Sequence, residues 1–272
     1  AWDVREKLRM KHPSPARDEG MIANTKRLSV LRVTEHGTSE TETVVVEEST
    51  LTIVFNGQEL VTLLCSPRDP EYLAAGFVQS QGLVKSKDDI KNMAIEKPGV
   101  VRIETKKRVE VSPESVLTSS GGRGKGLRMP QKVNEGSQMR LSAARVFSIM
   151  NDFEQRSETF KVTGGVHSAA ICDATGITVF NEDIGRHNAI DKVFGQCLLQ
   201  DTAIDDSLVL TSGRVSSEIL LKVATRGVPV IVSRNAPTDV AVKLANDLGM
   251  TVVGFVRGKD LTVYTNEWRI AN

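Results

Sequence analysis

Apolar and polar residues alternate between Leu28 and Leu64 in three runs, LSVLRVTE, TETVVVEE and TLTIVFNGQELVTLL. Alternation of period two places every second side chain on the same face of a strand, so these runs predict β-strands. The third run contains Asn56-Gly57, a dipeptide that favours the type I′ turn of a two-residue hairpin. We therefore expect a small antiparallel region in this part of the chain.

A helix is predicted directly after this region, with Ser66 as its N-cap and its end near Gly82. Its apolar residues Leu73, Phe77 and Val78 share one face at helical spacing. Strand-like runs resume as NMAIEK, VVRIETK and RVEVS. Strands thus dominate the first part of the chain.

Residues 117–138 (LTSSGGRGKGLRMPQKVNEGSQ) are rich in Gly, Ser, Lys and Arg and carry almost no apolar periodicity. Loops of this length are usually functional or disordered, so we expect a flexible functional loop. Its GKG run is not a phosphate-binding P-loop, and the alternative interpretation is a solvated linker. After it, apolar residues from Leu141 to Phe153 recur at helical spacing, with Ser142 as a candidate cap.

The second half of the chain alternates apolar strands with helices. The strand-like runs are VHSAAICD, ITVFNED, SLVLTSG, PVIVSRNAP, TVVGFVRG and DLTVYT, and the helical runs are NAIDKVFGQCLLQ, SSEILLKVATRG and TDVAVKLANDLG. Uninterrupted Val, Ile and Leu strands in such units predict an α/β fold with a mostly parallel central sheet. The expected organisation is a disordered or extended lead (1–27), a smaller β-rich domain (28–116), the loop (117–138) and an α/β domain (139–272).

Polar side chains cluster where the predicted strands end. Ser212 and Arg214 follow one buried strand, and Ser233 ends the next. In open α/β sheets, ligands bind beyond the carboxyl ends of the strands, where helix starts favour anions. Hydroxyl groups and Arg side chains suit phosphate recognition because they supply several donors and a bidentate cation. The alternative interpretation is plain helix capping, for which Ser216 is placed.

Two of the four histidines lie in neighbouring motifs. His167 begins a predicted strand, and the run GRHNAIDK opens a helix on which Arg186, His187 and Asp191 could share a side. A His near an Asp can act as a general base or bind a ligand by hydrogen bonds, although an oriented structural His is commoner. The adjacent Gly and Arg residues favour a functional interpretation.

Composition restricts the function classes. The net charge of +1, from 35 Lys and Arg against 34 Asp and Glu, gives no reason to expect a nucleic-acid partner. No run approaches the roughly 20 apolar residues of a membrane span, and the charged lead lacks the apolar core of a signal peptide, so we expect a cytoplasmic protein without membrane attachment. Cys65, Cys172 and Cys197 lie in apolar runs without metal-ligand spacing, which predicts buried, inert thiols and no metal site.

Several motifs together resemble the FdhD family of formate dehydrogenase accessory sulfurtransferases. The matching runs are LLCSPRDPEYLAAGFVQSQGLV, LTSSGGRGKG, RSETFKVTGGVHSAAICD, NEDIGRHNAIDKVFG, TSGRVSSEILLKVATRGVPVIVSRNAPTDVAVKLA and VVGFVRGKDLTVYT. The resemblance spans about residues 45–266. It implies a fold related to cytidine deaminases, with a smaller β-rich N-terminal part and without a catalytic zinc.

The resemblance also implies an activity, a cargo and partners. A loop cysteine would accept sulfur from a cysteine desulfurase as a persulfide and pass it to molybdenum in the bis(molybdopterin guanine dinucleotide) cofactor of formate dehydrogenase. Guanine nucleotide alone could mimic this cofactor, and the protein is expected to be a homodimer. The segment that corresponds to the cofactor site is Phe255, Val256, Arg257, Gly258, Lys259 and Asp260, which otherwise forms a turn between two strands.

The expected carrier loop lacks its cysteine. Family loops resemble Ser-Gly-Cys-Gly-x-Gly, whereas this chain has Ser120, Gly121, Gly122 and Arg123 at the matching positions. Three explanations stay open: a divergent member that binds cofactor without transferring sulfur, another thiol that substitutes, or a printed sequence that lacks one Cys between Gly121 and Gly122. We favour the third because the motif is intact around a one-residue gap. A nucleoside deaminase is the remote alternative, since His-x-Glu and Pro-Cys-x-x-Cys are absent.

Overall fold

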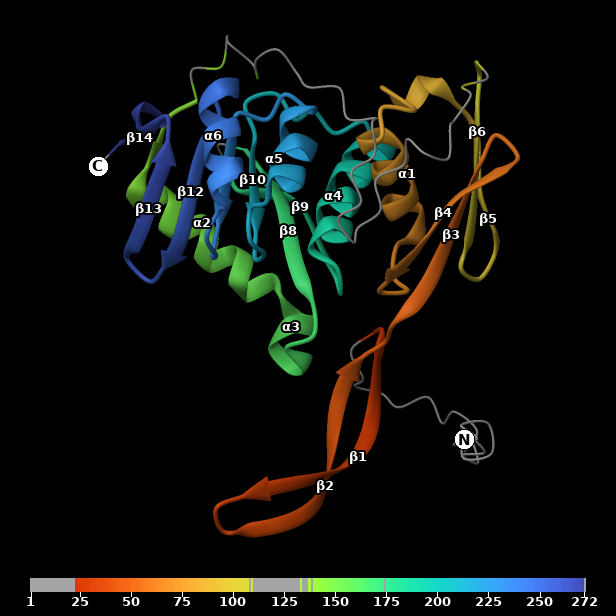
Figure 1. Cartoon of the computed structure of the whole chain (residues 1–272), viewed down its shortest axis with the longest axis vertical. Coiled ribbons are helices and arrows are strands. Elements are labelled where there is room, and N and C mark those ends of the chain that lie inside the picture. The colour runs from red at the N-terminus through yellow and green to blue at the C-terminus, as the bar shows by residue number, and fades with distance from the viewer. Residues whose placement is uncertain are drawn as a thin grey trace.

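The computed structural model describes residues 23–107, 109, 133, 137, 139–173 and 175–271 (Figure 1). A six-stranded sheet has the strand order β13-β12-β11-β10-β8-β9. Its strands are β8 (His167–Cys172), β9 (Ile177–Asp183), β10 (Leu208–Thr211), β11 (Val230–Ser233), β12 (Thr251–Arg257) and β13 (Asp260–Thr265). The order of strands in space differs from their order in the chain, so a crossover connection must link β9 to β10.

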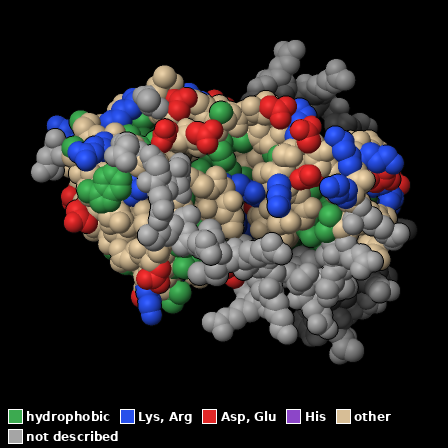
Figure 2. Space-filling view, turned by 90° about the horizontal axis from the view of Figure 1, so that it is seen from above, with side chains coloured by type: hydrophobic (Ala, Val, Ile, Leu, Met, Phe, Trp, Pro, Cys, Tyr) green, Lys and Arg blue, Asp and Glu red, His purple; other side chains and the backbone are tan. Residues whose placement is uncertain are grey.

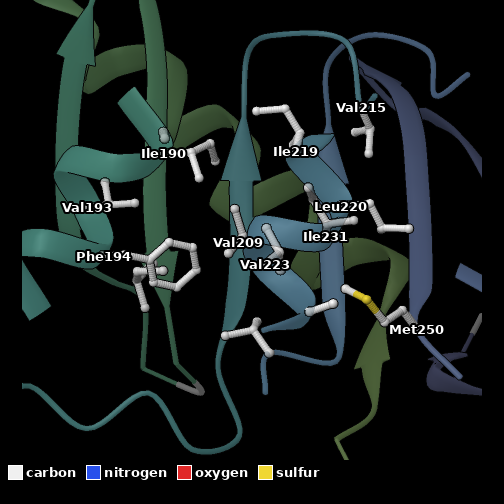
Figure 3. Packing of buried hydrophobic residues seen from close by; sticks show 14 of the residues in the cluster. Ile190, Val193, Phe194, Val209, Val215, Ile219, Leu220, Val223, Ile231 and Met250 are labelled. Atoms are coloured by element: carbon white, nitrogen blue, oxygen red, sulfur yellow. The ribbon is translucent and has the colours of Figure 1, made fainter. Parts of the chain in front are cut away.

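Helices cover both faces of this sheet. The helix α2 (Ala143–Arg156) packs on one face, where Val146, Ile149 and Phe153 join a buried cluster with alternate strand residues. The other face is covered by α4 (Arg186–Gln200), α5 (Ser217–Ala224) and α6 (Asp239–Leu248). Figure 3 shows residues of α4 and α5 converging on sheet residues such as Val209 and Ile231. The result is a three-layer α/β/α arrangement, which confirms the predicted α/β class.

The prediction of a mostly parallel sheet is wrong. Only the pairs β10–β11 and β11–β12 are parallel, whereas β12–β13, β10–β8 and β8–β9 are antiparallel. The strands β8 and β9 are consecutive in the chain and form one hairpin, and β12 and β13, joined at residues 258–259, form another. A short connection reverses the chain and makes its two strands antiparallel, whereas parallel neighbours need a long crossover connection. Two hairpins therefore flank a short parallel centre.

The N-terminal half holds a second sheet of four strands in the order β4-β3-β6-β5. Its strands are β3 (Ser49–Phe55), β4 (Gln58–Cys65), β5 (Ile90–Lys97) and β6 (Val100–Thr105), and the 3-10 helix η1 (Lys87–Asp89) precedes β5. Asn56 and Gly57 both have positive φ, 49° and 86°, as the predicted type I′ hairpin between β3 and β4 requires. The run RVEVS lies outside the described residues except for Val109.

The helix α1 (Pro70–Ser80) joins the two halves by packing against α4. A Cβ atom at Gly76 would collide with the backbone of Asp191, and one at Gly195 would collide with the backbone of Tyr72. Glycine is therefore needed at both places, because the two helix backbones are in direct contact. The proposed division into domains at the loop 117–138 stays a prediction, because that segment lies largely outside the described residues.

Helix starts were predicted with mixed success. Ser142 and Ser216 cap α2 and α5 as predicted, and Thr238, which was not predicted as a cap, caps α6; each accepts a backbone N–H of the first turn. The predicted cap of α1 is wrong, since the helix begins at Pro70 after Asp69 and Ser66 lies outside it. The long helix predicted after residue 141 stops at Arg156, and a short helix α3 (Glu158–Thr163) follows. Leu141 belongs instead to β7 (Leu141–Ser142), which pairs with β14 (Ile270–Ala271) beyond the 3-10 helix η3 (Glu267–Arg269).

A two-stranded arm extends away from both sheets in Figure 1. It consists of β1 (Thr25–Thr34) and β2 (Gly37–Val46), which pair with each other along their whole length and with no other strand of the described chain. Lys26 forms an ion pair with Glu47 at its base, with 3.0 Å between Nζ and Oε1. Val46 contacts Gly165 behind α3, so only the base of the arm touches the body.

Candidate functional site at the strand ends

The carboxyl ends of β10 and β11 meet the start of β8 at the edge of the sheet nearest α3. Ser212, just beyond β10, accepts the backbone N–H of Ser168 at 3.0 Å, and its Oγ lies 3.2 Å from Nδ1 of His167. The amide Nδ2 of Asn235 donates to the carbonyl of Ser212 at 2.6 Å. His167 and Ser212, both predicted site residues, are therefore brought together, and Asn235 fixes the turn between them and β11.

Ser233 has a structural role in this edge. It is fully buried, donates its hydroxyl to the carbonyl of Gly213 at 2.7 Å, and accepts the backbone N–H of Asn235 at 2.9 Å. The following turns are also tied together by a bridge between Val215 and Pro237. Both hydrogen-bonding functions of Ser233 are thus used within the protein, so its contribution is to shape the edge.

The first turn of α4 brings Arg186 against this edge. A Cβ atom on Gly213 would lie 2.9 Å from Cβ of Arg186, so the two residues fit together only because position 213 is glycine. The Nε atom of Arg186 is buried and has no hydrogen-bond partner among the described residues. Such a donor is costly unless a ligand or water accepts its hydrogen bond. Arg214, in the turn after β10, is exposed and adds a second cation to the strand-end edge.

His187 lies beside Arg186 but points into the protein. Its side chain is buried, and Nε2 lies 3.3 Å from Oε2 of Glu218 without hydrogen-bond geometry. Burial, then the charges of Lys222 and Arg186, lower the pKa of His187 to about 3. Burial and Arg186 likewise lower the pKa of His167, so both imidazoles are neutral near pH 7.

Asp191 is placed one turn deeper than the predicted site. It is buried and forms a short ion pair with Lys222 of α5, whose Nζ lies 3.4 Å from Oγ of Ser80. Burial raises the pKa of Asp191, and the attraction of Lys222 opposes that rise. Asp191 therefore holds α4 and α5 together and does not face the strand-end edge with Arg186.

The predicted cofactor segment forms the tight turn from β12 to β13. Phe255 has φ of 52° at a register irregularity, is 42% exposed, and donates its backbone N–H to the carbonyl of Asn235 at 3.4 Å. The guanidinium of Arg257 lies over the Phe255 ring, 5.6 Å from its centroid. Gly258, Lys259 and Asp260 are also exposed, whereas Val256 is buried in the core. Asn235 thus connects this turn to Ser212, so that the turn and the His167–Ser212 pair belong to one edge.

A buried ion pair that the sequence did not indicate supports the start of α4. Asp183, the last residue of β9, lies 2.7 Å from Nζ of Lys192, and both side chains are fully buried. The carboxylate also accepts the backbone N–H groups of Ser66 and Gly185 and the amide of Asn188. An acid directly before a helix start was the available signal, but the contact with Ser66 joins residues that are 117 apart in the sequence. This group fixes the backbone from which Arg186 and His187 project.

The three cysteines are free and buried, as predicted. Burial raises the pKa of Cys172 and Cys197 to about 12, and it also raises the pKa of Cys65, so none is poised as a thiolate. The predicted carrier-loop positions Ser120, Gly121, Gly122 and Arg123 lie outside the described residues. Within the described ranges, no group of three or more His, Cys, Asp or Glu side chains could hold a metal ion.

Hollows in the described part of the chain lie elsewhere on the molecule. A pocket of about 490 Å³ beside β9 is lined by Arg68, Tyr72 and Asn181 among others, and a groove of about 640 Å³ runs along β4 past Leu64 and Cys65. Neither is lined by the strand-end residues. The surface seen in Figure 2 interleaves Lys and Arg with Asp and Glu, in keeping with the small net charge. Where the chain is described, no helix has the length and apolar character needed to cross a membrane.

The fold and this edge define an α/β protein whose strand-end turns carry hydroxyl, amide and guanidinium groups suited to an anion. The chain belongs to the FdhD/NarQ family, whose family model matches residues 46–271. It is similar to the sulfur carrier protein FdhD of Bacillus subtilis, with 39% identity covering 85% of this chain and 92% of the relative. It is also 41% identical to the sulfur carrier protein FdhD of Listeria innocua, over 87% of this chain and 95% of the relative.

A solved structure is similar as well. The crystal structure of a protein assigned as a formate dehydrogenase accessory protein, from Desulfotalea psychrophila, superposes with a TM-score of 0.80 and 26% sequence identity. The match covers 91% of this chain and all of that chain. The family resemblance seen in the sequence motifs is therefore confirmed, and the matched structure has the same mixed α/β architecture.

Proposed function

We propose that this protein carries sulfur from a cysteine desulfurase to the molybdenum of bis(molybdopterin guanine dinucleotide), for use by the catalytic subunit of formate dehydrogenase. The names of its relatives, sulfur carrier protein and formate dehydrogenase accessory protein, support the sulfur and dehydrogenase parts of the proposal. The observation that carries the cofactor part is the connection, through Asn235, of the Phe255–Asp260 turn to the His167–Ser212 pair. The proposal includes the deaminase-like layering and the homodimer that the family resemblance implies.

The strand-end edge fits a phosphorylated cargo. Arg257 and Lys259 are exposed on one turn, Arg214 is exposed on the next, and the unpartnered Nε of Arg186 adds a donor that is already desolvated. Charged donors bind phosphate oxygens more strongly than neutral donors do. Gly213 leaves space where any larger residue would collide with Arg186. We propose that the guanine nucleotide parts of the cofactor bind here and that free guanine nucleotide is a usable mimic.

Arg257→Ala is expected to weaken the binding of guanosine diphosphate by about 1.5 to 3 kcal/mol, because a charged hydrogen bond to phosphate is lost. This corresponds to a roughly 10- to 150-fold rise in Kd. Isothermal titration calorimetry measures it directly. Arg102→Ala is the matched control, since Arg102 is paired with Glu96 at 2.8 Å on the other sheet and should leave Kd unchanged. An unchanged Kd for Arg257→Ala would remove this residue from the site.

Sulfur transfer requires a thiolate that can reach its donor. The thiolate attacks the outer sulfur of the desulfurase persulfide, the desulfurase thiolate leaves, and the carrier becomes the new persulfide. Cys65, Cys172 and Cys197 do not suit this step because each is buried with a raised pKa. The two remaining explanations are a cysteine missing from the printed sequence between Gly121 and Gly122, which we favour, and a protein that binds cofactor without carrying sulfur.

Alkylation followed by intact mass measurement separates these explanations. If the loop holds a cysteine, iodoacetamide should add one adduct to the native protein and four to the unfolded protein, because three thiols are shielded by burial. The untreated mass should exceed the mass of the printed chain by one cysteine residue. Incubation with a cysteine desulfurase and cysteine should then add one sulfur atom.

The second candidate function, a cofactor-binding chaperone without transfer chemistry, predicts different masses. The native protein would gain no adduct, the unfolded protein would gain three, and the untreated mass would equal that of the printed chain. Guanosine diphosphate would still bind with the same dependence on Arg257. The missing carrier thiol in the printed sequence is the observation that keeps this candidate.

A further inference from the structure

The arm formed by β1 and β2 exposes more apolar surface than a solvated hairpin normally carries. Leu28 is 48% exposed, Leu31 is 64% exposed and Val33 is 70% exposed. Leu28 and Leu31 point to opposite faces because side chains alternate along a strand. An isolated two-stranded hairpin is only marginally stable in water, and three or more strands are normally needed. The arm therefore has the properties of an element that is completed by another strand.

The residues of the arm lie almost entirely before the segment that the family model matches, which begins at residue 46. The chemistry of the strand-end edge therefore does not account for the arm. The outer edge of β1 and the outer edge of β2 both lack a neighbouring strand within the described chain. Such edges are templates for pairing with another chain. The charges along each edge decide whether that edge can pair with a second copy of this chain.

The charges of the two edges differ. Glu40 and Glu42 lie in the middle of β2, and a two-fold antiparallel pairing centred on residue 40, 41 or 42 would place carboxylates directly opposite each other. Like charges in opposite positions destabilise a sheet. The inner part of β2 cannot serve instead, since Val46 already contacts Gly165 of the body. The middle and the inner part of the outer edge of β2 are therefore unsuited to pairing with their own copy, and only a short pairing near the tip is left.

The outer edge of β1 is self-complementary. A two-fold pairing centred on Val30 places Arg27 opposite Val33 and Leu28 opposite Arg32. A pairing centred on Leu31 places Arg27 opposite Glu35 and Val30 opposite Arg32. Neither register brings like charges opposite each other, and both gather leucine and valine side chains on the two faces. The edge thus matches a second copy of itself without any change in the hairpin.

We infer that β1 pairs antiparallel with β1 of a second copy of this chain, so that two arms form one four-stranded sheet in the order β2-β1-β1-β2. This inference rests on the homodimer proposed above and assigns its contact to the arm. Each arm then has a partner on its exposed edge, and Leu28, Leu31 and Val33 are partly covered by side chains of the second copy.

The double variant Leu31→Lys/Val33→Lys tests this contact. It should raise the dimer dissociation constant at least about tenfold, because the new ammonium groups face Arg27 of the second copy in the pairing centred on Val30 and face each other in the pairing centred on Leu31. The hairpin itself should persist, since residue 31 lies opposite Glu40 within the arm. Sedimentation velocity over a dilution series measures the constant. Thr38→Lys/Thr41→Lys adds the same charge to β2 and should leave the constant unchanged.

Cysteine cross-linking fixes the register. A residue on the two-fold axis meets its own copy, so mild oxidation should convert either Val30→Cys or Leu31→Cys into a disulfide-linked dimer. Cys65, Cys172 and Cys197 are buried, and the wild-type chain oxidised in parallel shows any cross-link made by a loop cysteine. Thr41→Cys, on β2, should form no more linked dimer than the wild type on a non-reducing gel. A dimer that ignores the double variant and yields no cross-link would overturn the arm contact but leave the homodimer standing. A wild-type chain that is monomeric at all concentrations would overturn both, without bearing on guanine nucleotide binding or sulfur loading.

Discussion

Lys192→Met is expected to lower the free energy of unfolding by about 3 to 5 kcal/mol, the usual cost of removing one partner from a buried ion pair. Lys192 and Asp183 are both fully buried, with 2.7 Å between Nζ and Oδ2. Without the ammonium, the carboxylate keeps its hydrogen bonds from Ser66, Gly185 and Asn188 but loses its only close counter-charge among the described residues. Urea unfolding followed by circular dichroism measures the change.

Two variants separate the effect of charge from other effects. Lys87→Met removes an ion pair of similar length, 2.8 Å to Asp201, in which both side chains are about half exposed, so it should cost less than about 1 kcal/mol. Asp183→Asn/Lys192→Met should recover part of the loss, because no unpaired charge is then left in the core. An equal decrease in the free energy of unfolding for Lys192→Met and Lys87→Met would show that burial does not increase the contribution of the Asp183–Lys192 pair to stability.

The same buried pair explains why the site depends on parts of the chain that are far apart. Ser66 donates its backbone N–H to Asp183, and its hydroxyl accepts the backbone N–H of Ile184 at 3.1 Å. The turn before α4 is thereby held by the segment before α1. Since Arg186 is in the next turn, the N-terminal half supports the strand-end edge without touching a ligand there.

Local patterns predicted the elements that depend on local chemistry. The Asn56-Gly57 turn and the Ser142 and Ser216 caps formed as expected, because each needs only neighbouring backbone groups. The burial of Cys65, Cys172 and Cys197 followed from the apolar runs around them. These predictions required no knowledge of the tertiary fold.

The wrong predictions are those in which tertiary contacts decide the outcome. Serine is a common N-cap residue, but the hydrogen-bonding groups of Ser66 are used by Asp183 and Ile184, which lie 117 and 118 residues away. The prediction of a mostly parallel sheet failed for a different reason: only Ala174, Thr175 and Gly176 separate the runs VHSAAICD and ITVFNED, and a connection this short permits only an antiparallel hairpin. Asp191 has helical spacing with His187, yet Lys222 from another helix draws it into the core.

The candidate site was predicted in part for the same reason. Strand ends could be located from the sequence, and His167, Ser212 and the Phe255–Asp260 turn do lie along one edge joined by Asn235. Whether a polar group at that edge is open or already used depends on its neighbours. Ser233 is used by Gly213 and Asn235, whereas Arg186 keeps a buried donor unpaired among the described residues. The individual ligand contacts stay predictions.

Acidification should destabilise the protein through His187. Its pKa is about 3 in the folded state and about 6.5 in an unfolded chain, so the unfolded state binds more protons between these values. The contribution of the neutral His187 ring to the free energy of unfolding is fully present above about pH 6.5 and is lost as the pH falls toward 3. The loss is about 2 kcal/mol at pH 5 and roughly 4 kcal/mol over the full window. Protonation is unfavourable because the ring is buried beside Lys222 and Arg186, while Glu218 offers only a half-exposed counter-charge.

His187→Gln isolates this contribution because glutamine keeps a hydrogen-bonding side chain but does not titrate. The difference in unfolding free energy between pH 7 and pH 5 should be about 2 kcal/mol smaller in this variant than in the wild type, whatever the variant costs at pH 7. His36→Gln is the matched control, since His36 lies exposed in the turn of the arm and its removal should leave the difference unchanged. Parallel pH dependences for His187→Gln and the wild type would mean that the pKa of His187 is the same in the folded and the unfolded chain, which would contradict the effect ascribed to burial beside Lys222 and Arg186.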